Sequence, residues 1–298
     1  MLKCLPAFLL LAAVTPATAE EPAAKAPAPA PVTAPASTES PAEATLKQLV
    51  ARENELLTKA DPASPKYDAE EFRSQMQQLI DDYAGFIRLN PGFTAAYVAY
   101  GRLLLRHTEN RRKEGAALLL KANELDPNLA IVKNELGSYC AEEALFPQAA
   151  AYFFSAIQLE PKEPLYHFQL ASLLYEARDD LLKSGLYTRE QLDRAMHEGF
   201  RQAAALAPDS FSYAYRYGES FYDLASPDWD EALRVWQAIE QRVSPGLEQQ
   251  TIRLHEANVL IKLGRTAAAI QLLNTVTEDS LAKQRQKLID LLNPKAEK

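Results

Sequence analysis

The sequence predicts an all-α protein in which antiparallel helix pairs stack into a solenoid of about five to six repeats. Apolar residues recur three, four or seven positions apart along most of the chain, as they do on one face of a helix. Only 10 of the 298 residues are glycine, and alternating runs of Val, Ile or Thr are few, which argues against a sheet. Pro91, Pro127, Pro161 and Pro208 close successive segments at intervals of 36, 34 and 47 residues. Because two short amphipathic helices cannot bury their apolar faces alone, this repetition predicts stacking.

Residues 1–19 have the layout of a signal peptide. Lys3 gives a positive start, a run of about ten mostly apolar residues follows from Leu5 to Val14, and Ala17-Thr18-Ala19 resembles a cleavage site. The apolar run is too short to span a bilayer as a helix, which needs about 20 residues. We therefore expect an exported protein with no transmembrane segment in the mature chain. The alternative is an apolar N-terminus that is simply disordered.

Export without a disulfide favours a bacterial periplasm or cell envelope. After cleavage, Cys140 is the only cysteine that remains, so no intramolecular disulfide can form. Residues 20–44 contain six prolines and nine alanines without apolar periodicity, and this composition predicts a disordered linker.

Residues 45–293 form the predicted solenoid. Its first repeat begins with a helix near Thr45, turns at Asp61-Pro62 to Pro65, and continues in a helix from Tyr67 to Leu89. We predict repeats at residues 45–91, 94–127, 130–161, 164–208, 211–245 and 250–277, followed by a capping helix at 278–292. In that capping helix, Leu281, Leu288, Leu291 and Leu292 should face inward, whereas Lys283, Arg285 and Lys287 should face water.

The unit from Ala130 to Pro161 is the most regular. Gly137 lies on the apolar face of its first helix, where a glycine costs roughly 1 kcal/mol relative to alanine. This cost predicts that another backbone approaches too closely for a side chain. Pro147 suits the first turn of the second helix, because its missing N–H is not needed there.

The spacing of this unit resembles the tetratricopeptide repeat (TPR). The resemblance rests on a small residue within the first helix, then Ala, an aromatic residue four later, Ala three later and Pro five later. These positions fall on Gly137, Ala149, Phe153, Ala156 and Pro161. The resemblance covers roughly Ala60 to Val276. It implies a right-handed solenoid whose function is to bind a protein or peptide.

The fourth repeat carries 13 additional residues. Leu181 to Tyr187 is predicted as a loop around Gly185, and Thr188 begins a capping box for a long helix that runs to Ala207. A tolerated surface insertion and a dedicated binding feature are both compatible with this length. Further along, Ser226 is the predicted cap of the next helix, with Pro227 in its first turn.

Chemistry other than binding has little support in the sequence. The formal net charge of −8 disfavours nonspecific nucleic-acid binding. The four histidines are widely spaced, and neither a phosphate-binding Gly-rich loop nor a hydrolase nucleophile motif is present. The pair Glu219 and Asp223, four apart on a helix, is more typical of a solvated face than of an acid and base. We expect no enzyme activity, no cofactor and no metal.

The resemblance also implies where a partner binds. In TPR proteins the first helix of each repeat lines the concave surface, so the residues of those helices outside the core should face a groove. The candidate residues are Val98, Arg102, Asn134, Ser138, Phe168, Ser172, Tyr175, Tyr215, Glu219, Tyr222, Asn258 and Ile261. Their amide, hydroxyl and aromatic groups suit a peptide. For Tyr215 and Tyr222, packing between repeats is an equal alternative.

The resulting hypothesis is a non-catalytic scaffold or adaptor for a protein or peptide in the periplasm or cell envelope. The alternative is a structural subunit that uses the same surface to assemble with copies of itself, as a homo-oligomer, or to dock into a membrane-associated complex.

Overall fold

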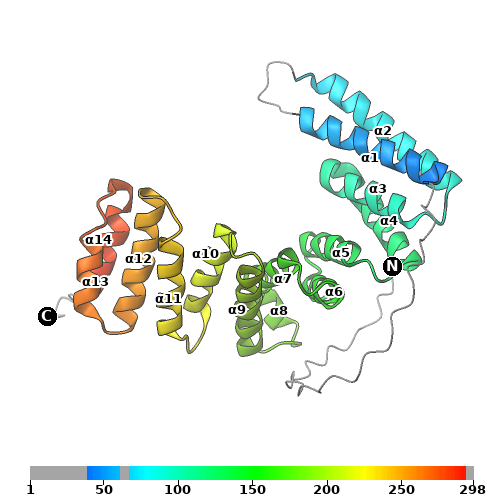
Figure 1. Cartoon of the computed structure of the whole chain (residues 1–298). Helices are drawn as coiled ribbons and strands as arrows, with labels where there is room; N and C mark the ends of the chain where they lie inside the picture. The colour runs from blue at the N-terminus through cyan, green and yellow to red at the C-terminus, as the bar shows by residue number, and fades with distance from the viewer. Residues whose placement is uncertain (1–38, 61–66, 293–298) are drawn as a thin grey trace, which may run out of the picture. The chain divides into compact units, whose positions relative to one another are not determined.

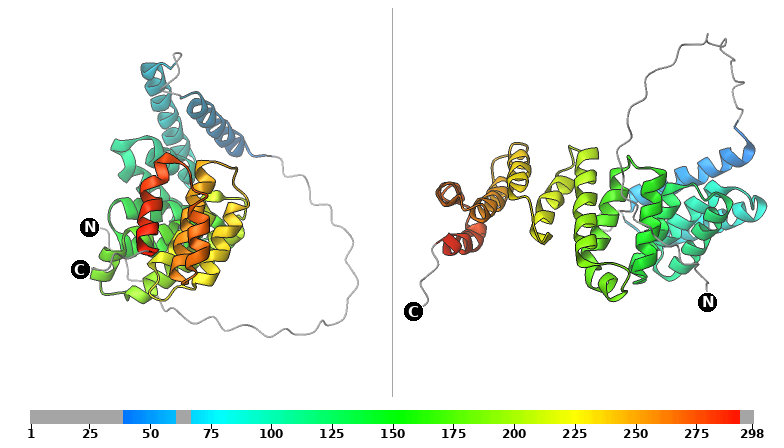
Figure 2. Two further views of the ribbon diagram at one scale, coloured as in Figure 1. Left: turned by 90° about the vertical axis from the view of Figure 1, so that its left-hand side faces the viewer. Right: turned by 90° about the horizontal axis from the view of Figure 1, so that it is seen from below.

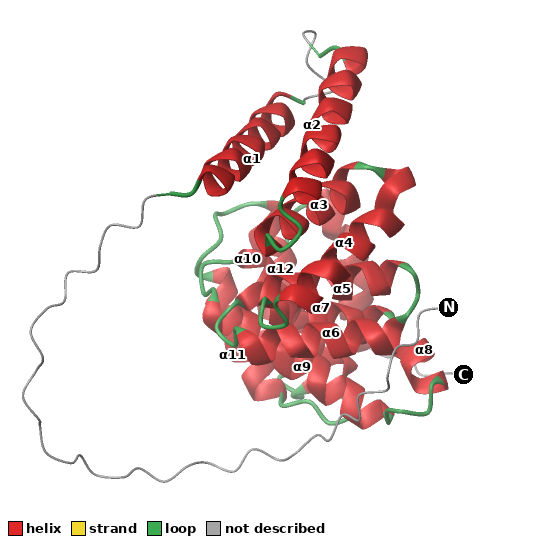
Figure 3. Cartoon of the chain, turned by 90° about the vertical axis from the view of Figure 1, so that its right-hand side faces the viewer, coloured by secondary structure: helices red, strands yellow, loops and turns green. Residues whose placement is uncertain are grey.

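The computed structural model describes residues 39–60 and 67–292. Throughout these two ranges, every regular element is a helix (Figures 1 and 3). The predicted signal peptide, most of the predicted linker and the predicted turn from Asp61-Pro62 to Pro65 lie outside the described residues. The chain divides into two compact units, the first ending at Pro127 and the second beginning at Asn128.

Unit 1 holds the first four α-helices. They are α1 (Pro41–Lys59), α2 (Ala69–Leu89), α3 (Thr94–His107) and α4 (Arg112–Leu125), with the short 3-10 helix η1 (Glu109–Arg111) before α4. Helix α1 begins four residues before the predicted Thr45, because Ser40 and Glu43 form a reciprocal capping box and Pro41 occupies the first turn. The last four residues of the predicted linker are therefore helical.

Two of the buried tyrosines of unit 1 stack on each other. The rings of Tyr83 and Tyr100 stack with centroids 5.6 Å apart, and the Tyr83 hydroxyl donates to Glu53 at 2.7 Å. Helices α3 and α4 meet at two glycines. A Cβ on Gly115 would lie 2.8 Å from the backbone oxygen of Gly101, so this contact requires glycine.

Unit 2 is a series of packed helices, which Figure 2 shows from two further sides. Its elements are α5 (Ala130–Glu142), α6 (Phe146–Leu159), α7 (Pro164–Glu176), α8 (Arg178–Lys183), α9 (Arg189–Leu206), α10 (Phe211–Ser220), η2 (Phe221–Asp223), α11 (Trp229–Glu240), α12 (Leu247–Lys262), α13 (Thr266–Leu273), η3 (Asp279–Leu281) and α14 (Ala282–Leu292). Neighbouring helices along the chain pack on each other, and the principal pairs are α5 with α6, α7 with α9, α11 with α12, and α12 with α13.

Gly137 on α5 makes the expected close contact with a different group. A Cβ there would lie 2.8 Å from the ring of Phe153 on α6, so the prediction that another backbone approaches was wrong. The ring is 3% exposed and fills the space that a side chain would take. Pro147 lies in the first turn of α6 as predicted.

The long repeat differs from its prediction in one respect. Leu181 is buried and belongs to the short helix α8, so the predicted loop is confined to the residues after Lys183. The Leu181 side chain has no exposed surface and packs in the core of unit 2, unlike a residue of a surface loop. The capping box at Thr188 with Gln191 is confirmed, and α9 then runs for 18 residues.

Two helix ends nearer the C-terminus also differ. Asp228 caps α11 by accepting from the backbone N–H of Glu231 at 2.9 Å, so Ser226 is not the cap and Pro227 precedes the helix. In α14, Leu291 is 61% exposed rather than inward. Arg285 is partly buried and donates to the backbone oxygen of Val276 at 2.7 Å, instead of facing water.

Candidate functional site

The candidate residues all lie on helices that come first in the predicted repeats. Those in unit 1 are Val98 and Arg102 on α3. Those in unit 2 lie on α5 (Asn134, Ser138), α7 (Phe168, Ser172, Tyr175), α10 (Tyr215, Glu219), η2 (Tyr222) and α12 (Asn258, Ile261). Asn134 is 2% exposed and Tyr175 is 40% exposed, whereas the other ten are half-buried. Asn134 is thus the member least able to reach a partner.

Within unit 2, the structure brings the residues of α10, η2 and α12 together around His255. The Tyr215 hydroxyl lies 2.9 Å from Nε2 of His255, and the Tyr222 hydroxyl lies 3.3 Å from Nδ1. The imidazole stacks on Trp236 of α11, with ring centroids 4.1 Å apart and an interplanar angle of 10°. We call Tyr215, Tyr222, Trp236 and His255 the tyrosine–histidine cluster.

Each ring nitrogen of His255 has a tyrosine hydroxyl as its partner in this cluster. Burial lowers the pKa of His255 to about 4, so the ring is neutral near pH 7 and has one donor and one acceptor nitrogen. The Tyr222 hydroxyl also donates to the backbone oxygen of His255 at 3.4 Å. The two tyrosine side chains are thereby held in fixed orientations.

The hydroxyl groups of the cluster stay protonated. Burial raises the pKa of Tyr222 and of Tyr215, and in Tyr222 a hydrogen bond from Asn258 opposes part of that rise. The cluster therefore carries no charge near neutral pH. Such uncharged donors and acceptors, set among aromatic rings, suit contacts with a peptide backbone and apolar side chains.

A second group of side chains surrounds Tyr175 on α7. The Arg216 guanidinium lies over the Tyr175 ring, 4.7 Å from its centroid, and Arg178 lies over the same ring at 5.5 Å. Arg216 also pairs with Glu219 at 2.5 Å. Tyr175 is thus oriented by two cations yet keeps two fifths of its surface open, so it is the most accessible aromatic side chain of the candidate set.

Arg178 belongs to a partly buried ion network. It lies 3.0 Å from Asp193 and 3.3 Å from Asp223, and Asp193 is itself 5% exposed. Glu219 and Asp223, the carboxylate pair considered above as an acid and base, each form an ion pair with an arginine, and these ion pairs account for their positions. The sequence pattern did not single out either arginine.

The candidates on α5 and α7 are less distinctive. Gln169 donates to the Ser138 hydroxyl at 3.3 Å, which links the two helices. Phe168 packs against Phe200 and Tyr213, with centroid distances of 5.6 and 4.8 Å. We therefore assign Phe168 chiefly to packing and keep Tyr175 and the tyrosine–histidine cluster as the candidate site.

Sequence reasoning missed His255 and Trp236. One signal was available for His255, because it precedes Asn258 by three residues and so shares its helix face. Within residues 39–60 and 67–292, no group of three or more His, Cys, Asp or Glu side chains is placed to hold a metal ion. Across the same ranges, no helix is both long and apolar enough to cross a membrane.

Comparison with known proteins gives structural relatives only. No family model and no curated protein matches the sequence. Among solved structures, the chain is similar to YrrB, which is described as a TPR protein with an unusual peptide-binding site. The identity is 15% and the TM-score is 0.56, and the match covers 70% of this chain and 97% of YrrB. It is also similar to PilF of Pseudomonas aeruginosa at 14% identity and a TM-score of 0.52, covering 83% and 98% of the two chains.

A third similar structure is that of Naa15/Naa10 bound to HypK-THB. The identity is 14% and the TM-score 0.56, and the match covers 85% of this chain but 34% of the other, so the present chain spans about a third of that relative. At such low identities the likeness concerns the fold alone. Together with the helix pairs described above, these comparisons show that the chain has the all-α helical-repeat fold of tetratricopeptide-repeat proteins.

Proposed function

We propose that this chain is a non-catalytic scaffold that binds a protein or peptide in the periplasm or cell envelope. The observation that carries the proposal is the combination of Tyr175 and the tyrosine–histidine cluster on α7, α10, η2, α11 and α12. Their rings and hydroxyl groups are oriented in advance by hydrogen bonds, stacking and cation–π contacts. Side chains that are oriented before binding lose less conformational entropy when a partner binds.

The fold supports the proposal without naming the partner. YrrB has the same fold and is described as having a peptide-binding site. The location rests on the layout of residues 1–19. N-terminal sequencing of protein recovered from the periplasmic fraction should find Glu20 first, and recovery of an intact N-terminus from the cytosol would contradict export.

The binding surface is tested by substituting its most exposed aromatic residue. Tyr175→Ala removes a ring that is 40% exposed, so it should reduce capture of partners from envelope fractions with little change in melting temperature. Phe154→Ala is the matched control, because Phe154 is 37% exposed on α6, outside the candidate site. Equal capture by both variants would argue against this surface.

The same experiment separates the adaptor from the structural alternative. An adaptor should retrieve one or more other proteins through this surface. Retrieval of nothing but further copies of the chain would instead favour self-assembly.

A further inference from the structure

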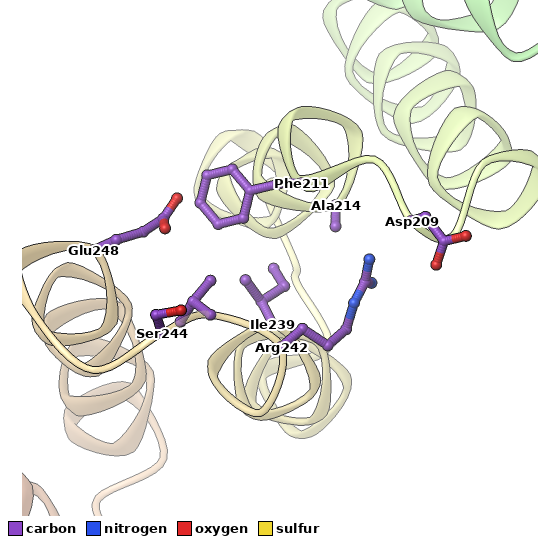
Figure 4. A pocket seen from close by; sticks show the side chains of 8 residues that line it. Asp209, Phe211, Ala214, Ile239, Arg242, Ser244 and Glu248 are labelled. Atoms are coloured by element: carbon purple, nitrogen blue, oxygen red, sulfur yellow. The ribbon is translucent and has the colours of Figure 1, made fainter.

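A pocket lies in unit 2 where α10 and α12 begin and α11 ends (Figure 4). Its volume is about 230 Å³. The lining residues are Asp209, Phe211, Ala214, Ile239, Arg242, Val243, Ser244 and Glu248. None of the sequence patterns described above pointed to this place.

The size and lining of the pocket suit a single large side chain. Phe211, Ala214, Ile239 and Val243 supply its apolar wall, and Ile239 is 3% exposed. An apolar cavity of about 150 Å³ is enough to hold a benzene ring, whereas sites for cofactors and drug-sized ligands start near 300 Å³. The volume of about 230 Å³ therefore fits an aromatic or long aliphatic side chain and is too small for most cofactors.

The rim of the pocket carries more negative than positive charge. Figure 4 shows the Arg242 side chain on the side of Asp209, with Glu248 across the pocket beside Phe211. Asp209 and Arg242 have opposite charges and lie on the same side of the pocket. On the other side, no basic residue of the lining faces Glu248. Glu248 lies in the first turn of α12. A cation is thus the complementary group on that side.

One lining residue of the pocket contacts the candidate site, and another shares a helix with it. Phe211 contacts Tyr215, which is one turn further along α10, with ring centroids 5.6 Å apart. On α12, His255 follows Glu248 by two turns and bonds Tyr215. A segment that covers the tyrosine–histidine cluster and runs toward the starts of α10 and α12 therefore reaches the pocket.

We propose that this pocket selects the partner. Its occupant is an aromatic or long aliphatic side chain of a bound peptide segment, next to a lysine or arginine that pairs with Glu248. This inference rests on the proposed function, since it names the kind of segment that the same face binds. Burial of the apolar side chain gives most of the affinity, and Glu248 gives the charge preference.

The test uses the full chain and a library of random peptides displayed on phage. Peptides are selected on the wild-type protein, and their affinities are measured as synthetic peptides by fluorescence anisotropy. Ala214→Leu should fill the pocket, because Figure 4 shows Ala214 directed into it, and should weaken binding about tenfold or more. Glu248→Gln should weaken binding about threefold to tenfold, by less at high salt.

Ala238→Leu is the matched control. It makes the same change at an exposed position of α11 outside the pocket lining, and it should leave affinity unchanged. Melting temperatures of all three variants near that of the wild type would show that they fold. The selected peptides should share a large apolar residue beside a basic one.

Two results would overturn the inference. Peptides that bind the wild type and Ala214→Leu equally, or that place acidic residues beside the apolar one, would show that the pocket does not select them. If such peptides still lose affinity in Tyr175→Ala, the proposed function stands and only the pocket inference falls. If no peptide is enriched and envelope fractions yield no partner, both fall.

Discussion

Gly218 on α10 offers a direct test of how firmly the candidate site is packed. A Cβ at this position would lie 2.7 Å from Cζ2 and 2.8 Å from Cε2 of Trp236, closer than real side chains approach one another. The indole has no exposed surface, and it is held by the stacked ring of His255 and by the edge of Tyr215 at 5.2 Å. The added methyl group therefore has nowhere to go unless the tyrosine–histidine cluster shifts.

The expected cost of Gly218→Ala is the difference between two opposing effects. Replacing glycine by alanine inside a helix stabilises by about 1 kcal/mol. Inserting a methyl group into a filled core costs about 1–3 kcal/mol. Because Trp236 is fully buried and held on more than one side, the upper part of that range applies, and we expect a net loss of about 1–2 kcal/mol. For a unit of this size, each kcal/mol lowers the melting temperature by about 2–4 °C.

Thermal unfolding of the full chain, followed by far-UV circular dichroism, measures this loss. Gly85→Ala is the comparison, because Gly85 is helical and an added Cβ meets nothing within 4 Å. That variant should gain up to about 1 kcal/mol. If Gly218→Ala also raised the melting temperature, the Trp236 ring would be free to move, and the claim that the cluster is oriented in advance would fail.

Two further predictions concern buried carboxyl groups. Burial, and secondly the neighbouring Glu240, raise the pKa of Glu256 from 4.5 to about 8, so the folded state holds this proton more tightly than the unfolded state. The contribution of Glu256 to the free energy of unfolding should be greatest below pH 4.5 and should fall as the pH rises to about 8. Urea titrations at several pH values should show that Glu256→Gln removes this decline. A pH profile that the substitution leaves unchanged would contradict the prediction. In the same assay, Asp193→Ala should lower the free energy of unfolding by about 2–4 kcal/mol, because it removes a buried partner of Arg178. Glu190→Ala, which breaks an exposed ion pair, should lower it by less than about 1 kcal/mol. Equal losses in the two variants would refute the role assigned to burial.

The helical architecture was predictable because it depends on local patterns. Pro147 and the capping box at Thr188 act within one turn of their own positions, and both begin helices as expected. The choice of cap before α11 was less predictable, since Ser226 and Asp228 are both competent and stand two residues apart. Asp228 caps the helix because its carboxylate reaches the backbone N–H of Glu231.

The contacts of the candidate site could not be predicted in the same way. The family resemblance assigned Tyr215 and Tyr222 to one face, but their common partner His255 is 40 and 33 residues away along the chain. Which groups meet across two helices depends on rotation and axial register, and spacing within one helix does not fix either. At Gly137 the pattern showed that space was short, and the structure was needed to show that the Phe153 ring occupies it.

The position of the tryptophans makes the candidate site observable without a label. Trp229 and Trp236 are the chain's only tryptophans, and both lie on α11. Trp236 is stacked on His255, and Trp229 lies 5.7 Å from Tyr222. Intrinsic indole emission therefore reports on this one region of unit 2, while the helices of unit 1 are silent in that signal. Ligand titrations can be read directly from the surface where binding is proposed.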